Sequence, residues 1–350
     1  MGVDALFIVL EAALGLSVTG VNLLVCVTVY LHKEVRTLTN YLITCLALAD
    51  LSVGVLAVPC SILLSLDLTL CLNSCLLLAC WPLITTQFSV FVLLAIAINT
   101  HLKIRQPSRY RILVTKKRVT MAISLCCILA LIIGFTPVMG WNSLDLPAES
   151  LMPNVSLAAE RSLLRERISL LGFFPQPFEM ARVANLSRAV AGPCSFRHVI
   201  SLNYMVYFMF FCCTLMPLST MLGIYADAFR LVHGYVNSQQ FRSAKRCDIQ
   251  TAKTLFLMVG LFCLCWLPLN LANCLAFFCP SCSPSSWLVN LMVALSHLNS
   301  LLNPMIYALR KKDFGTVLKA VLLQHLPGAS RYRSCLSGSK VSPIFHVTRP

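Results

Sequence analysis

Long runs of apolar residues alternate with short polar segments along the whole chain. Seven runs are long enough for an α-helix to cross a bilayer, which takes about 20 mostly apolar residues. These runs are Ala5–Leu31, Tyr41–Leu66, Cys75–Asn99, Val119–Gly140, Leu202–Ala226, Thr254–Phe278 and Trp287–Leu309. The pattern predicts an all-α membrane protein, a seven-transmembrane helix bundle formed by residues 1–310.

Composition and charge support a membrane protein and orient it. Hydrophobic residues make up 58% of the chain and charged residues only 12%, about half the charge of a soluble domain. The net charge is +15, but the basic residues occupy short segments between apolar runs, which argues against nucleic acid as a partner. They cluster after the first, third, fifth and seventh runs, so these segments are expected to face the cytoplasm and the N-terminus the outside.

The long segment at about 142–201 is therefore expected to be extracellular. It holds two glycosylation sequons, Asn154-Val-Ser and Asn185-Leu-Ser, which are usable only on that side of the membrane. Most of the 18 cysteines lie inside the apolar runs, where they are expected to pack as small hydrophobic residues. The cysteines at the outer ends, where oxidation is possible, are Cys71, Cys75, Cys194, Cys279 and Cys282.

A group of polar residues is expected near the middle of the bundle. Asp50 is the only acid near the centre of any run, where a charge costs at least about 2.5–3.5 kcal/mol. Polar residues at similar depth, or on one face of the last run, are Asn22, Ser89, Ser296, Asn299 and Asn303. Two interpretations remain open: a small polar site for a cation such as Na⁺, or ordinary hydrogen bonds between helices.

A second polar group is expected nearer the outside. Trp266, Asn270 and Asn273 follow i, i+4, i+7 spacing and share one helix face. Glu11 and His297 lie at comparable depth in the first and last runs and are able to pair. Together these residues predict a polar-edged cavity for a small molecule.

Several function classes are disfavoured by the sequence. Intramembrane aspartyl proteolysis needs two carboxylates, and there is no nucleophile elbow, phosphate-binding loop or metal-binding helix motif. In the absence of these motifs we expect no enzyme activity. A retinal-binding protein is disfavoured as well, because the last run has no lysine to hold retinal. A membrane transporter or channel is a remote alternative, because no inverted repeat is visible.

Three segments resemble motifs of rhodopsin-like G-protein-coupled receptors: Leu46–Asp50, Cys265–Pro268 and Asn303–Tyr307. Within that family the chain is similar to the adenosine receptors, notably at Ala49–Pro59 and Gly134–Asn142. The resemblance implies a plasma-membrane receptor that binds extracellular adenosine or a related purine nucleoside and signals to heterotrimeric G proteins. It also implies a short amphipathic eighth helix and a cytoplasmic tail in residues 311–350, next to membrane lipid.

The resemblance further implies roles for individual positions in a ligand site. Phe196 is expected to stack on the adenine ring, and Asn273 to hydrogen-bond its exocyclic amine and a ring nitrogen. Ribose contacts, the cavity floor and the remaining ligand-binding roles fall to Glu11, Thr86, Met205, Trp266, Ser296 and His297.

Other positions are assigned by the same resemblance. The sodium site matches Asp50, Ser89, Asn299 and Asn303, so Na⁺ is expected as an allosteric ion and no cofactor is expected. The disulfides are Cys75 with Cys194 and Cys279 with Cys282. The positions expected to act in G-protein coupling are Thr100, Tyr225 and Tyr307.

The chain also departs from the family pattern. Arg197 stands where an acid often follows the stacking phenylalanine, while Met209 and Pro82 replace usual lining residues. The family's Asp-Arg-Tyr triplet is Asn99-Thr100-His101 here, without the arginine that contacts the G protein. The alternative to a signalling receptor is thus a ligand-binding but signalling-deficient one, a decoy or a heteromer partner.

Overall fold

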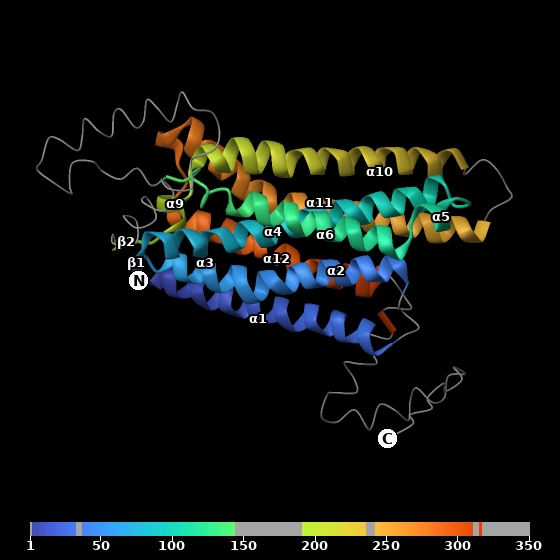
Figure 1. Cartoon of the computed structure of the whole chain (residues 1–350), viewed down its shortest axis with the longest axis horizontal. Helices are drawn as coiled ribbons and strands as arrows, with labels where there is room; N and C mark the ends of the chain where they lie inside the picture. Colours follow the sequence, from blue (N-terminus) through green and yellow to red (C-terminus); the bar gives the residue numbers. More distant parts are fainter. Residues whose placement is uncertain (1, 33–36, 144–190, 236–241, 311–314, 317–350) are drawn as a thin grey trace, which may run out of the picture.

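The computed structural model describes residues 2–32, 37–143, 191–235, 242–310 and 315–316, and these are almost entirely helical. The helices run side by side along the long axis of the molecule (Figure 1). The spanning elements are α1 (Gly2–Leu31), α2 (Leu38–Ser52), η2 (Val53–Ala57), α3 (Val58–Ser65), α4 (Leu72–Arg105), α6 (Lys116–Phe135), η3 (Tyr204–Leu215), α10 (Met216–Tyr235), α11 (Arg242–Phe278) and α12 (Ser286–Arg310). The predicted all-α membrane bundle is confirmed.

Six of these spans satisfy a simple length-and-hydropathy criterion for crossing a membrane. The last predicted run forms α12, which packs against α1 and α11 like the other members of the bundle. Its amides, serines and histidine lower its hydropathy, and several of them are buried inside the bundle. Membrane helices tolerate such residues when they face protein and not lipid.

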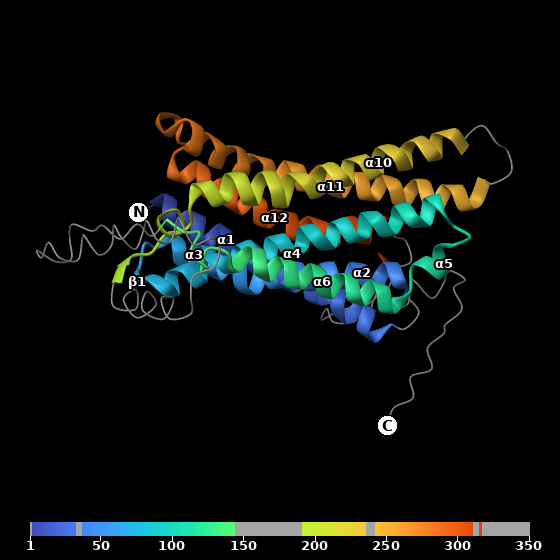
Figure 2. The same ribbon diagram turned by 45° about the horizontal axis from the view of Figure 1, so that its top comes forward.

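Helix α4 is the centre of the bundle. It packs against α2, α3, α6, α10 and α11, and α4 lies beside α6 while α10 lies beside α11 (Figure 2). Helix α6 approaches α4 closely at Gly134, where an added Cβ would come within 2.9 Å of the backbone nitrogen of Ile84. A glycine is needed at this contact.

The ends of several helices differ from the predicted runs. Helix α4 continues to Arg105, and α11 begins at Arg242, so both extend past the apolar residues that predicted them. Helix α6 ends at Phe135 and not at Gly140, because Pro137 has no N–H with which to continue the helical hydrogen bonds. The predicted eighth helix and tail lie outside the described residues, except for the helical pair 315–316.

The outer end of the bundle is held by a small hairpin and disulfides. Strand β1 (Thr69–Cys71) pairs antiparallel with β2 (Ala191–Pro193). Cys75 at the start of α4 is bonded to Cys194, which follows β2, and Cys279 is bonded to Cys282 around the short helix η4 (Pro280–Cys282). Both expected pairings are present, whereas the sequons at Asn154 and Asn185 lie outside the described residues.

Prolines inside the spans leave backbone carbonyls without their usual partner, because proline has no N–H to donate to the residue four positions earlier. Pro217 lies at the junction of η3 and α10 and cannot bond the carbonyl of Cys213. Gln87 of α4 donates its Nε2 to that carbonyl at 2.9 Å. The neighbouring helix thereby replaces the missing hydrogen bond.

The same replacement occurs at two other prolines. Pro304 leaves the carbonyl of Ser300 free in α12, and Asn22 of α1 donates Nδ2 to it at 3.0 Å. Pro137 follows α6, and the hydroxyl of Tyr204 donates to the carbonyl of Ile133 at 2.6 Å. These bonds cross from one helix to another, so they fix how the helices pack as well as satisfying the backbone.

We predict that Gln87→Leu lowers stability by about 0.5–2 kcal/mol, the range for a hydrogen bond between membrane helices. The carbonyl of Cys213 then has no donor from α4. The thermal unfolding midpoint of the detergent-solubilised protein measures the loss. Ser17→Ala is the matched control, since the lipid-facing Ser17 only bonds a carbonyl of its own helix. Equal midpoints for Gln87→Leu and the control would contradict the prediction.

Candidate ligand-binding site

A cavity of about 480 Å³ opens at the outer end of the bundle, within the usual range of about 300–1,000 Å³ for small-molecule sites. Its walls come from α1, α3, α4, α11, α12, η3 and the short helix α9 (Phe196–Val199). The predicted positions that line it are Thr86, Phe196, Met205, Trp266, Asn273, Ser296 and His297. Four runs far apart in sequence therefore converge on one space, as expected.

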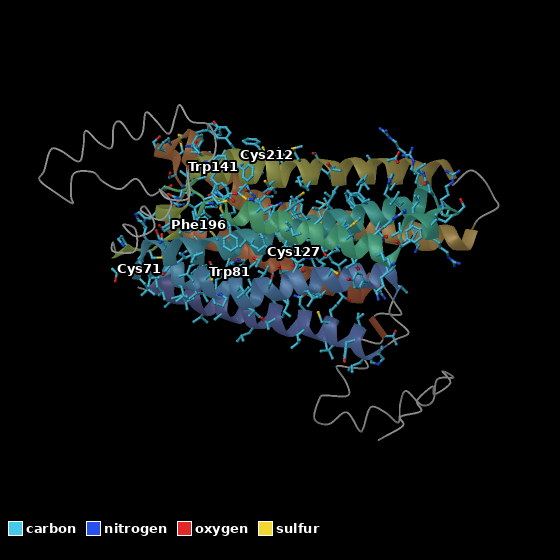
Figure 3. The ribbon with its side chains drawn as sticks, viewed as in Figure 1. Cys71, Trp81, Cys127, Trp141, Phe196 and Cys212 are labelled. Atoms are coloured by element: carbon cyan, nitrogen blue, oxygen red, sulfur yellow. A yellow bond between two sulfur atoms is a disulfide. The ribbon has the colours of Figure 1, made fainter. Side chains whose placement is uncertain are left out.

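Phe196 reaches the cavity because its segment is tied to the bundle. The disulfide from Cys194 to Cys75 and the β1–β2 pairing hold the chain against the outer end of α4. Phe196 begins α9 two residues after that disulfide and lies near the β1–β2 end of the molecule (Figure 3). An aromatic ring at a cavity wall is suited to stacking on a planar ligand.

Glu11 does not line the cavity but bonds a residue that does. His297 Nδ1 lies 2.9 Å from Glu11 Oε2 and 3.2 Å from Oε1. Glu11 is fully buried and His297 is 4% exposed, so the contact is shielded from water. Because the proton on Nδ1 is donated to the carboxylate, Nε2 is the ring nitrogen left for a ligand. The predicted pairing is confirmed.

The inner end of the cavity is closed by aromatic rings. Trp266 stacks on Phe262 with ring centroids 6.1 Å apart and planes inclined by 27°. Phe262 is only 1% exposed and belongs to the main hydrophobic core. A ligand that contacts Trp266 is therefore linked, through Phe262, to the main hydrophobic core of the bundle.

The polar side chains of the cavity fall into two groups. Asn270 donates to the carbonyl of Trp266 at 2.9 Å, and Ser296 to that of Val293 at 2.7 Å, so both are already bonded. Asn273 and Thr86 have no hydrogen-bond partner among the described residues. Both side chains are half-buried, and a ligand that fills the cavity would shield them from water and is the natural partner for them.

Three departures from the family pattern also face the cavity: Pro82, Arg197 and Met209. The structure adds lining residues that the sequence did not single out, among them Asp67, His198 and Asn290. Asn290 lies seven residues before His297 in α12, so helical spacing would have indicated it. Asp67 comes from the turn after α3 and His198 from the short helix α9, and both segments are too short for a periodic pattern to place them.

Asp50 is fully buried between α2, α4 and α12. Ser89 donates Oγ to Asp50 Oδ1 at 2.8 Å, and Asn303 donates Nδ2 to Oδ2 at 2.9 Å. Within the described structure, the buried Oδ1 atoms of Asn299 and Asn22 have no hydrogen-bond partner. Ser89 and Asn303 thus meet Asp50 as predicted, whereas Ser296 lines the outer cavity instead. Asn299 lies about one turn of α12 before Asn303, and its buried oxygen has no partner among the described residues.

The inner end of α4 shows what replaces the missing arginine. Thr100 is 3% exposed and donates its hydroxyl to the carbonyl of Ile96 at 2.9 Å, within its own helix. Asn99 Oδ1 accepts from the hydroxyl of Tyr110 in α5 (Tyr110–Leu113) at 2.9 Å. Burial raises the pKa of Tyr110 above its ordinary value, so the hydroxyl stays protonated and donates.

An ion-pair cluster links α4 to α10 at this end. His101 Nε2 lies 2.7 Å from Asp227 Oδ2, and Arg105 Nη1 lies 2.9 Å from the same oxygen. One turn of helix separates His101 from Arg105, so both reach one carboxylate. Arg105 therefore provides a cationic contact to α10 just after the altered triplet, and His101, the last residue of the triplet, shares the same carboxylate. Tyr225 is buried nearby in α10, and the side chain of Tyr307 lies outside the described residues.

Comparison with known proteins agrees with this architecture. Residues 21–156 and 168–307 match the family described as 7 transmembrane receptor (rhodopsin family). The chain is 38% identical to adenosine receptor A2a of Homo sapiens, over 92% of this chain and 73% of that receptor. It is 36% identical to adenosine receptor A2b of Gallus gallus over 94% and 92%, and 35% identical to that of Mus musculus over 96% and 93%.

The chain therefore belongs to the rhodopsin family of seven-transmembrane receptors, which are G-protein-coupled receptors and not enzymes. Within that family it is adenosine-receptor-like, so the resemblance expected from its motifs is confirmed. It is a multi-pass membrane protein, and a transporter or channel is not favoured.

Proposed function

We propose that the chain is a plasma-membrane receptor, with its N-terminus outside, that binds an extracellular purine nucleoside. The observation that carries this proposal is the composition of the outer cavity. Phe196 offers an aromatic face, Asn273 offers an unbonded amide, and His297 is oriented by a buried carboxylate. The similar receptors are adenosine receptors by name, which supports the same ligand class.

The amide of Asn273 suits a purine because it carries a donor and an acceptor side by side. An adenine edge presents an amine hydrogen and a ring nitrogen in the complementary order. Thr86 and His297 lie further from the outer ends of their helices than Asn273 does, and they suit ribose hydroxyls, which both donate and accept hydrogen bonds. The base and the sugar are thereby assigned to different ends of one cavity.

We expect Asn273→Ala to weaken adenosine binding by about 5- to 150-fold, since an unsatisfied buried partner costs about 1–3 kcal/mol. Saturation binding of radiolabelled adenosine, with a broad xanthine antagonist as competitor, measures it. Leu271→Ala is the control, because Leu271 is on the same helix and 54% exposed. The ligand assignment fails if surface-expressed protein shows no saturable binding of either compound.

The polar group around Asp50 is proposed to hold Na⁺ as an allosteric ion. Oxygen ligands suit hard cations, and the residues present supply the Asp50 carboxylate and the unpaired oxygen of Asn299. Ser89 and Asn303 bond the carboxylate and keep it in place. The unpaired buried oxygen atom is the observation that favours an ion over hydrogen bonds between helices alone.

Raising NaCl should therefore lower adenosine affinity by about 5-fold or more, the size of typical coupling between two sites. The ion favours the resting packing, so an agonist that prefers another packing competes with it indirectly. Asp50→Asn should abolish the effect in equilibrium binding. Choline chloride at equal ionic strength is the control, and an equal effect of both salts would point to general screening.

We propose that this receptor couples to G proteins more weakly than a receptor of the same fold that carries the arginine of the family triplet. Thr100 offers one short hydroxyl that is already bonded inside α4, where the family has a long planar cation with about five donors. Arg105 does not substitute for it, since it is held by Asp227. The signalling receptor is the main proposal, and weak coupling refines it.

We predict that Asn99→Asp with Thr100→Arg raises agonist-driven nucleotide exchange by about 10-fold or more. His101 is left unchanged in this variant, so its contact with Asp227 is kept. A nucleotide-exchange assay at matched surface expression measures the gain, with Asn99→Asp alone as the control. Robust exchange by the unmodified chain, with no gain in the variant, would show that other cytoplasmic contacts compensate.

A further inference from the structure

The residue next to the stacking ring carries a charge that nothing else in the cavity uses. Arg197 follows Phe196 in α9, lines the cavity and is exposed. No hydrogen bond or ion pair joins Arg197 to another described residue. Its neighbour His198 is different, because its Nδ1 lies 2.6 Å from Ser195 Oγ. A guanidinium with no partner among the described residues is therefore part of the cavity wall, directly after the ring expected to stack on a ligand.

A guanidinium has five N–H donors in a planar fork and no acceptor. A ring edge beside it must offer acceptors, because an amine there would set donor against donor. In a 6-aminopurine the edge carries the amine hydrogens at position 6. In a 6-oxopurine the same edge carries O6 next to N7, both acceptors, which is the pair that arginine binds with two parallel hydrogen bonds.

The rest of the cavity is compatible with the 6-oxo edge. Asn273 carries both a donor and an acceptor, so it can donate to O6 and accept from the protonated N1 of a 6-oxopurine. Asp67 is the one acid in the described cavity lining, and Glu11 lies behind that lining. Glu11 is fully buried and bonded to His297, and Asp67 comes from the turn after α3, not from the segment of Phe196.

We propose that Arg197 is a specificity-determining residue that makes this cavity prefer 6-oxopurine nucleosides, the class of inosine, over the 6-aminopurine adenosine. The inference rests on the proposed purine site and names the ligand class within it. Purine shape, ribose contacts and stacking on Phe196 are common to both nucleosides. The two nucleosides differ in hydrogen-bond polarity at position 6 and at N1, and we assign Arg197 to the recognition of position 6.

The test compares saturation binding of radiolabelled inosine and adenosine to purified receptor in lipid nanodiscs, where no deaminase interconverts them. The unmodified receptor should bind inosine about 5- to 150-fold more tightly, the discrimination of one good bidentate pair. Arg197→Glu should reverse the preference, and Arg197→Gln should bring the ratio close to one. Arg111→Glu, an exposed cytoplasmic charge change in α5, should leave it unaltered.

The outcomes distinguish a failure of the role assigned to Arg197 from a failure of the proposed purine site. A preference for adenosine that Arg197→Glu leaves unchanged would overturn the role of Arg197, while the purine site would stand. Saturable binding of neither nucleoside would overturn both. A reversal in Asp67→Asn but not in Arg197→Glu would transfer the specificity to Asp67 and overturn the inference. Because the readout is a ratio, partial loss of folded protein in a variant does not affect it.

Discussion

The bundle depends on one constraint: every backbone carbonyl inside the membrane needs a donor, because lipid supplies none. Prolines within and beside the spans break this rule, and at Pro137, Pro217 and Pro304 a side chain from another helix supplies the donor. Gln87 bonds the carbonyl freed by Pro217, and Asn22 bonds the one freed by Pro304. Each of these hydrogen bonds ties a proline-containing span to one particular neighbouring helix. The helices therefore have a defined packing, although lipid alone would tolerate many arrangements.

Hydrogen-bond partners also distinguish polar residues that stabilise the bundle from those available to a ligand. Asn22 and Gln87 donate to backbone, and Asn270 does so at the cavity wall, whereas Asn273 and Arg197 are unbonded within the described structure. Side chains of similar chemistry therefore serve different purposes within a few helical turns. Asn273 and Arg197 both line the outer cavity, where a small molecule can supply the missing partners.

Sequence predicted much of this because membrane helices follow simple rules. Run length predicted the spans, and spacing predicted the shared face of Trp266 and Asn273 and the pairing of Glu11 with His297. The π-helical segments η2 and η3 were not predicted, since they depend on how a proline is accommodated by its neighbours. Nor was the Asp227 cluster, because no local pattern announces contacts between residues more than 120 positions apart.

Helix α4 carries two duties at adjacent positions. Thr86 lines the cavity. Gln87, about 100° further around the helix, donates a hydrogen bond to the carbonyl of Cys213 in the fifth span. Because a helix moves as a rigid unit over one residue, any rotation of α4 at Thr86 would also load the hydrogen bond from Gln87 to the carbonyl of Cys213. Through these two adjacent residues, α4 connects the wall of the outer cavity to the junction between η3 and α10.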